Sequence, residues 1–333
     1  MKKCTAAFLS AVTLCLILAA GQPSAAEKLP PLGRNVTIWF DTGGPVGGPY
    51  NTIVQNGALQ AASDLGCDLK LLYSDWNPEK MIDNFKTALA ARPDGIVIMG
   101  HPGDGAYAPF IQEAFDAGIL VTCVDTNLPQ ALEKYKSRGF GSIGTDPDVM
   151  GTTLAKEALS RSGLKKGDRA LIWGLKQLEE RGRRARAMIR TLEEAGVVVD
   201  YIEISPEVDK DTSMGTPIIT GYIGAHADCR MILIDHGALT SQMENFLRAA
   251  GKGPDAIFVG GFSLSPATAS AIENGYVDIV SEMQPYLLGY LSVAQIVLTQ
   301  KYGFTGLELD TGGGLVHKGN IGLVAPLAKQ GIR

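Results

Sequence analysis

Carboxylate, amide and hydroxyl side chains stand where the apolar runs of this sequence end. Asp41 follows the run 35–40, and Asp125 follows the run 119–124. The full set after such runs is Asp41, His101, Asp104, Asp125, Thr126, Asn127, residues 174–179, Asp235, His236, Ser263 and residues 282–284. Carboxylates and amides accept hydrogen bonds from hydroxyl groups, and lysine and arginine are scarce at these positions. The set therefore predicts a site for a neutral, hydroxyl-rich ligand and disfavours phosphate or carboxylate ligands. Each residue alone has a second interpretation, because Asp, Asn, Ser and Thr also cap turns and helices.

A glycine-rich segment, WFDTGGPVGGPY at residues 39–50, stands between a predicted strand and a predicted helix. Its glycines do not have the spacing of a dinucleotide-binding loop, and it lacks the lysine of a P-loop. Pro45 and Pro49 also lack the backbone N–H that would bind a phosphate. The segment therefore predicts no nucleotide site. Glycine lets the backbone approach a ligand closely, so we expect this loop to form the lip of a cleft, with Tyr50 and Asn51 beside it.

The sequence contains no complete catalytic motif. Residues 261–265, GFSLS, nearly form a nucleophile elbow, but Ser265 stands where that motif requires glycine. Asp235 and His236 are adjacent, yet no third group is identified for a catalytic triad. No pair of histidines has the i, i+4 spacing of a zinc site on a helix; they are His101, His226, His236 and His317. We predict no catalytic residue, no metal site and no cofactor.

The N-terminus has the pattern of a secretory signal peptide over residues 1–26. Two lysines precede an apolar run, and small residues end the segment before Glu27. The run is too short to favour a transmembrane helix, although a membrane anchor is the alternative. We therefore expect export to the periplasm, with no direct insertion into the membrane.

The net charge of the chain narrows the range of partners. The chain has a net charge of −5, and removal of the two lysines in the signal peptide would make it more acidic. An acidic exported protein is a poor candidate for binding nucleic acid.

Cys67, Cys123 and Cys229 lie among apolar or small residues, which favours buried thiols; a Cys67–Cys123 disulfide is the alternative.

Apolar runs alternate with helical patterns along the chain. The first series of strands covers 35–40, 67–74, 95–100 and 119–125, and the pattern starts again after residue 143. This alternation indicates two α/β lobes, each with a parallel sheet. Ligands of such sheets bind beyond the carboxyl ends of the strands. Asp125 is the strongest candidate contact, although it could instead cap a turn; Pro129 is expected to stop any immediate helix.

Several segments resemble the periplasmic sugar-binding proteins of ABC transporters, in the class of the ribose-binding protein. They are RPDGIVIMG, AFDAGILVTCVDTN, the segment from Val259 to Phe304, and TGGGLVHKGNIGLVAPLAKQGIR. The resemblance implies an α/β fold of two Rossmann-like lobes with parallel-sheet cores, joined by a three-crossing hinge, which is the type I periplasmic binding protein fold. The lobe boundaries would be 34–142 plus 284–311 and 143–283 plus 312–333. The crossings would lie near 142–145, 282–284 and 310–313.

The resemblance also implies ligand contacts. Tyr50 with Asn51 matches an aromatic pair that packs on the sugar, and Asp125 matches an acid of the family, with Asn127 beside it. Trp173 is a candidate second aromatic wall, although core packing is its alternative. Asp41 and His101 complete the contacts expected in the first lobe.

In the second lobe, the expected contacts depart from the ribose-binding pattern. Glu179 stands at a usual arginine, Asp235 at a usual asparagine and Ser263 at a usual aspartate. Met283 occupies a usual glutamine, which makes Gln284 a substitute contact. Arg181 matches an arginine that we interpret as structural. The ligand implied is a monosaccharide other than ribose or a sugar alcohol, and the additional carboxylates would tolerate an amino group.

The function implied is capture of a sugar or polyol by a monomeric periplasmic protein that delivers it to the membrane permease of an ABC transporter. Two alternatives stay open. The liganded protein could meet a receptor as a sugar sensor, or the chain could be an enzyme that acts on a sugar.

Overall fold

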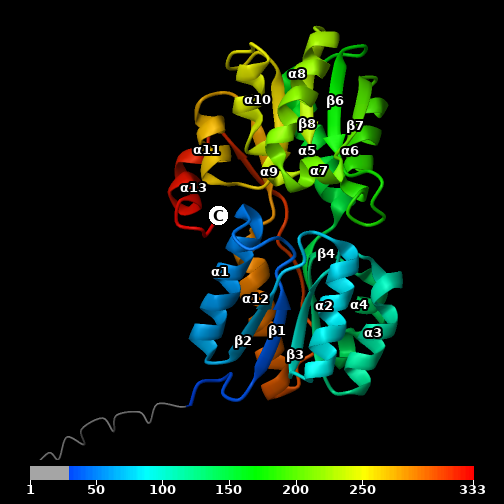
Figure 1. The fold of residues 1–333 in the computed structure, drawn as a ribbon, viewed down its shortest axis with the longest axis vertical. Coiled ribbons are helices and arrows are strands. Elements are labelled where there is room, and N and C mark those ends of the chain that lie inside the picture. The colour runs from blue at the N-terminus through cyan, green and yellow to red at the C-terminus, as the bar shows by residue number, and fades with distance from the viewer. Residues whose placement is uncertain (1–29) are drawn as a thin grey trace, which may run out of the picture. The chain divides into compact units, whose positions relative to one another are not determined.

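The computed structural model describes residues 30–333, so the expected signal peptide lies outside the described residues. Within this range the chain forms two six-stranded sheets, and helices lie on both sides of each (Figure 1). We call each sheet with its helices a lobe. None of the helices in residues 30–333 has the length and apolarity needed to cross a membrane.

The first lobe contains a parallel sheet in the order β11-β5-β4-β3-β1-β2. Its strands are β1 (Thr37–Asp41), β2 (Asp68–Leu72), β3 (Gly95–Met99), β4 (Leu120–Thr126), β5 (Gly141–Thr145) and β11 (Glu308–Asp310). Its helices are α1 (Pro49–Leu65), α2 (Pro78–Ala91), α3 (Asp104–Asp116), α4 (Pro129–Tyr135) and α12 (Pro285–Tyr302). Side chains of α1 and α12 share one core cluster with β1, and α2, α3 and α4 share another with β3 and β4. The central strands β3 and β4 are therefore buried from both sides, which explains their continuous apolar runs.

The second lobe repeats this plan in the order β12-β10-β9-β8-β6-β7. Its strands are β6 (Arg169–Gly174), β7 (Val198–Glu203), β8 (Cys229–Ile234), β9 (Phe258–Phe262), β10 (Ile279–Glu282) and β12 (Gly314–His317). Its helices are α5 (Pro147–Ser162), α6 (Arg183–Glu194), α7 (Pro206–Lys210), α8 (Gly215–Ala225), α9 (Gly237–Thr240), α10 (Met243–Ala249), α11 (Pro266–Glu273) and α13 (Ile321–Ala328). β12 is antiparallel to β10, whereas the other described pairs of this sheet are parallel.

The chain passes between the two sheets three times. β5 pairs with β4 as far as Thr145, and α5 of the second lobe begins at Pro147. The first crossing is therefore at Asp146. The second crossing lies between β10 and α12, and the third lies between β11 and β12. The Gln284 side chain joins these two crossings, because its Nε2 donates to the Thr311 carbonyl at 3.0 Å.

One detail corrects the sequence analysis. Pro129 does not stop a helix but begins α4, because the first helical position needs no backbone N–H and tolerates proline. The chain between residues 237 and 249 forms two short helices, of which α9 ends at Thr240 and α10 begins at Met243.

The three described cysteines are free thiols, so the alternative Cys67–Cys123 disulfide is not present. Cys123 and Cys229 are buried, and Cys67 is partly exposed. Burial raises the pKa of the Cys123 thiol well above its ordinary value, which keeps this side chain in its neutral form.

Candidate functional site

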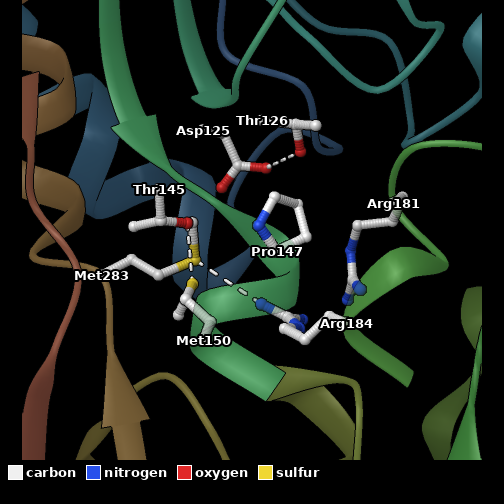
Figure 2. Close-up of a pocket in the computed structure, with 8 residues that line it drawn as sticks. All are labelled: Asp125, Thr126, Thr145, Pro147, Met150, Arg181, Arg184 and Met283. Atoms are coloured by element: carbon white, nitrogen blue, oxygen red, sulfur yellow. Dashed lines mark hydrogen bonds between the residues drawn. The ribbon is translucent and has the colours of Figure 1, made fainter. Parts of the chain in front are cut away.

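A small cleft with a cavity volume of about 10 Å³ lies where the carboxyl ends of strands from the two lobes face each other. β4 and β5 contribute from the first lobe, while α5, the segment before α6, the start of α6 and the second crossing contribute from the second (Figure 2). Its lining residues are Asp125, Thr126, Thr145, Pro147, Met150, Arg181, Arg184 and Met283. The position agrees with the general placement of ligands in open parallel sheets.

Asp125 has a strained backbone at the end of β4. Its φ is 71°, in the left-handed region that non-glycine residues seldom adopt and that costs about 1–3 kcal/mol. Gly144 of β5 makes room for it, since a Cβ there would lie 2.5 Å from the Asp125 carbonyl oxygen. The surrounding sheet thus fixes where the carboxylate points.

The Asp125 carboxylate is held by side chains of the first lobe. Tyr50 Oη donates to Oδ1 at 2.6 Å, and His101 Nε2 hydrogen-bonds Oδ2. Among the described residues no backbone N–H donates to this carboxylate, so the structure does not support the alternative role as a cap. Burial opposes its ionisation, but His101 and the bonds from His101 and Tyr50 outweigh burial and hold the pKa of Asp125 well below its ordinary value.

The two rings that bond this carboxylate, Tyr50 and His101, both lie against a third ring, Trp76. Trp76 stacks on His101, with ring centroids 5.6 Å apart, and lies 5.8 Å from the Tyr50 ring. Trp76 is partly exposed and was not among the predicted contacts. Its position after β2 could have indicated it, because β2 is the one strand of the first series after which no contact residue was predicted.

The glycine loop is held by Asp41 and Asn51. The Asp41 carboxylate accepts from Gly43 N at 2.8 Å, from Ser74 Oγ at 3.0 Å and from Asn84 Nδ2 at 2.9 Å. Burial raises the pKa of Asp41 despite these bonds. Asn51 Nδ2 donates to the Pro45 carbonyl at 2.7 Å. Both side chains therefore use protein partners to shape the lip of the cleft.

Two arginines enter the cleft from the second lobe and share Asp235. Arg181 Nη1 lies 2.8 and 2.9 Å from the Asp235 carboxylate oxygens, and Arg184 Nε also bonds this carboxylate. Burial opposes ionisation of Asp235, but the two guanidinium groups outweigh it and lower its pKa. The expected scarcity of basic side chains is thus corrected. The two arginines stand seven and ten residues after the end of β6 at Gly174, so a search limited to the residues that directly follow a strand does not include them.

The remaining wall of the cleft is apolar and consists of Pro147, Met150 and Met283. Met283 lies at the second crossing, and its Sδ is 3.7 Å from both Tyr50 Oη and Arg184 Nη1. The Met283 thioether therefore lies between the Tyr50 hydroxyl group and the Arg184 guanidinium group.

The other predicted residues lie elsewhere. Asn127 Oδ1 accepts from Ser142 Oγ at 3.3 Å. Ser263 has a left-handed backbone with a φ of 69°, is partly exposed and does not line the cleft. Glu179 is exposed and does not line the cleft either. The expected aromatic wall at Trp173 is corrected, because this side chain is fully buried in the core of the second lobe, against Phe246.

Residues 44–301 match a family model described as a periplasmic binding protein domain. The chain belongs to the periplasmic binding protein family. The family expected from the sequence is thereby confirmed, as is the α/β fold of two lobes with largely parallel sheets.

This binding protein has sugar-binding relatives at low identity. It is 25% identical over 292 residues to the xylose/arabinose-binding protein of Sulfolobus acidocaldarius, covering 82% of this chain and 69% of the relative. It is 25% identical over 170 residues to the D-ribose/D-allose-binding protein of Pseudomonas aeruginosa, covering 50% of this chain and 51% of that one.

Solved structures share the fold of this binding protein. A carbohydrate transporter protein of Acidothermus cellulolyticus in complex with myo-inositol has a TM-score of 0.75 at 22% identity, covering 90% of this chain and 100% of the other. A solute-binding protein of Burkholderia graminis in complex with D-arabinose has a TM-score of 0.74 at 20% identity, covering 86% and 96%. At these identities the likeness establishes the fold alone.

The cleft of this binding protein can form hydrogen bonds of both kinds. Asp125 offers acceptor lone pairs on one side, and Arg181 and Arg184 offer donors on the other. Two carboxylates, Asp125 and Asp235, balance the two guanidinium groups in charge. A ligand with several neutral hydroxyl groups could both donate to and accept from these side chains.

Proposed function

We propose that this protein captures a monosaccharide or sugar alcohol in the cleft between its lobes, outside the cytoplasm, and delivers it to the permease of an ABC transporter. The observation that carries the proposal is the placement of Asp125 opposite Arg181 and Arg184 within one cleft. The sugar ligands named for its relatives and for proteins of the same fold support this class of ligand.

In the proposed complex, the Asp125 carboxylate accepts hydrogen bonds from ligand hydroxyls, and Arg181 and Arg184 donate to ligand oxygens. Such charge-assisted bonds are about twice as strong as neutral ones. Trp76 and Tyr50 offer ring faces to the apolar C–H side of a sugar. Asp235 keeps the arginines in place and offsets their charge, so we infer that a neutral ligand is preferred over a sugar phosphate.

Closure of the two lobes would enclose the ligand. The proposed lobes comprise residues 34–145 with 285–310 and residues 147–282 with 314–333, and the crossings between them act as the hinge. We infer that the protein works as a monomer, without a cofactor and without turnover of the ligand. Residues 1–26 would direct it to the periplasm.

A calorimetric screen of the mature protein tests this function. Its arms are pentoses, hexoses, amino sugars, polyols and sugar phosphates, with amino acids as a different solute class. We expect saturable binding of at least one neutral sugar or polyol, and tighter binding of that sugar than of its phosphate. Saturation at 100 times the Kd should stabilise the fold by about 2.7 kcal/mol. Binding of an amino acid but of no sugar or polyol would refute the proposal.

A further inference from the structure

Residues 329–333 follow α13 of the second lobe and reach α1 of the first lobe (Figure 1). Helix α13 is fixed in the second lobe, since its last residue, Ala328, belongs to the core cluster of that lobe. Gly331 N donates to the Ala328 carbonyl at 3.1 Å, which sets the turn that leaves the helix. Asn56 Nδ2 of α1 donates to the Gly331 carbonyl, also at 3.1 Å. We call residues 329–333 the strap, because they connect the two lobes.

Gly331 suits this contact in two ways. Its φ of 66° lies in the left-handed region that glycine adopts without strain. A Cβ at this position would lie 2.6 Å from Asn56 Nδ2, so a larger residue would displace the Asn56 amide. The next residue of α1, Gly57, lies where α1 packs closely against the Tyr286 carbonyl of α12. The strap therefore contacts a closely packed part of the first lobe.

The strap also carries the partner of a buried carboxylate. Glu282, the last residue of β10, is fully buried, and its Oε2 accepts a hydrogen bond from Arg333 Nη2. Arg333 is the one cationic partner of this carboxylate among the described residues. Burial raises the pKa of Glu282, and the nearby Arg333 guanidinium opposes that rise. Removal of one partner of a buried ion pair is strongly destabilising, so Glu282 keeps the Arg333 side chain in place.

Glu282 stands where two of the three crossings meet the second lobe. The second crossing, at residues 283–284, begins directly after it. Its backbone pairs with Gly314, where β12 begins after the third crossing. The strap is therefore anchored beside two crossings through Arg333 and bonded to the first lobe through Gly331. It is a fourth link between the lobes, and this link is not covalent.

The bond between Asn56 and Gly331 depends on how the lobes are arranged. A donor–acceptor distance of about 3.6 Å no longer counts as a hydrogen bond, so a relative movement of about 1 Å between α1 and the strap would break it. A contact that is made in one arrangement and lost in another shifts the equilibrium toward the first. The favoured arrangement is the one in which Asp125 and Arg181 line a single cleft.

We propose that residues 329–333 hold the lobes in this arrangement, with Arg333 on Glu282 as the anchor and Gly331 on Asn56 as the contact that is released when the lobes move apart. Neither Asn56 nor any residue of the strap lines the cleft. A change in the strap therefore alters the arrangement of the lobes from outside the ligand site.

The distance between spin labels on the two lobes tests this proposal in the ligand-free protein. Exposed glutamates of α3 and α6 provide the labelling sites, through Glu113→Cys and Glu193→Cys. Cys67→Ser removes the partly exposed native thiol, whereas Cys123 and Cys229 are buried. Double electron–electron resonance then gives the distribution of distances between the lobes.

Asn56→Ala removes the donor on the first lobe. We expect the population outside the main distance of the otherwise unchanged labelled protein to rise roughly 3- to 10-fold relative to the population within it, the range for one hydrogen bond. The melting curve should show no loss of stability in the first lobe, because alanine is the best helix former.

Gly331→Ala and Gly303→Ala form a matched pair. Both glycines have a φ of 66°, so an added Cβ strains the backbone equally, but nothing lies within 4 Å of the Cβ position at Gly303. Gly331→Ala should shift the distance distribution as Asn56→Ala does, and Gly303→Ala should leave it unchanged.

The anchor is tested by Arg333→Ala combined with Glu282→Gln, which removes the ion pair without leaving a buried carboxylate unpaired. We expect the same shift as in Asn56→Ala, and an unshifted distribution would overturn the role of Arg333.

Unchanged distributions in both Asn56→Ala and Gly331→Ala would overturn the strap. A shift in Gly303→Ala as large as that in Gly331→Ala would also overturn it, because loss of stability alone would then move the lobes. The measurement needs no sugar, so neither result bears on the function proposed above.

Discussion

The hydroxyl group of Tyr50, at the start of α1, donates to the carboxylate of Asp125, at the end of β4, over a distance of 2.6 Å. The bond joins the glycine-rich lip of the cleft to the strand end that supplies the proposed ligand acceptor, Asp125. Because Tyr50 Oη also lies 3.7 Å from Met283 Sδ, the same side chain contacts the second crossing between the lobes. The lip of the cleft, Asp125 and the second crossing are therefore linked by direct contacts of one side chain.

We expect Asp125→Ala to weaken sugar binding about 30- to 1,000-fold, equivalent to roughly 2–4 kcal/mol, because ligand hydroxyls would lose a charged acceptor in a buried site. Calorimetry measures the Kd, and a melting curve establishes that the variant folds. Glu179→Ala serves as the control, since it removes an exposed carboxylate and should leave the Kd unchanged. An Asp125→Ala affinity within threefold of wild type would show that Asp125 is not a ligand contact.

Gly57→Ala should destabilise the first lobe by about 1–3 kcal/mol, because the helices α1 and α12 pack closely there and a Cβ would overlap the Tyr286 carbonyl. Gly322→Ala in α13 is the matched control: nothing lies near its Cβ position, and the substitution should stabilise the fold by about 0.4–1 kcal/mol. Urea unfolding measures both. Equal effects of the two substitutions would contradict close packing at Gly57.

Asp278 gives a test of pH dependence. Burial raises its pKa from 3.8 to about 6, with Asp255 adding to the rise, although the carboxylate accepts a bond from Val259 N at 2.7 Å. Between about pH 4 and pH 6 the folded state holds a proton that the unfolded state has released. The contribution of Asp278 to the free energy of unfolding therefore falls as pH rises through this window.

The variant Asp278→Asn removes that titration but keeps an oxygen that can accept from Val259. We expect the free energy of unfolding of the variant, minus that of the wild type, to be larger at pH 7 than at pH 4. Urea unfolding of both proteins at both pH values measures it. A stability difference between the two proteins that does not change with pH would contradict the raised pKa.

Ligand binding should contract the molecule. The three crossings lie at Asp146, at residues 283–284 and at residues 311–313, and they consist of short segments that can absorb a change of φ and ψ. Small-angle X-ray scattering with and without a saturating sugar should show a smaller radius of gyration in the complex. Identical scattering profiles at saturation would count against closure.

The part of the site that the sequence could predict follows from one rule, that ligands of parallel sheets bind beyond the carboxyl ends of the strands. Asp125 and His101 follow apolar runs that are buried on both faces, so both the runs and their ends are visible in the pattern of residues. Tyr50 was found through the glycine loop. Such features depend on local sequence, and the alternation of strands and helices depends on it as well.

The missed or corrected parts depend on tertiary structure. Arg181 and Arg184 reach the cleft from beyond the end of β6 because Asp235, which directly follows β8, pairs with them. Trp173 ends an apolar strand as expected, but its ring lies in the core because Phe246 of α10 packs against it. Neither pairing leaves a pattern of spacing in the sequence.

The placement of the tryptophans has an optical consequence. The chain has three: Trp173 is fully buried, Trp39 lies beneath the Lys70 ammonium at 3.8 Å, and Trp76 stands between Tyr50 and His101 next to the cleft. A ligand that displaces water from the cleft changes the surroundings of Trp76 and leaves those of Trp173 unaltered. Intrinsic fluorescence of the unlabelled protein should therefore report the arrival of a ligand through a single indole, and Trp76→Phe should silence that signal.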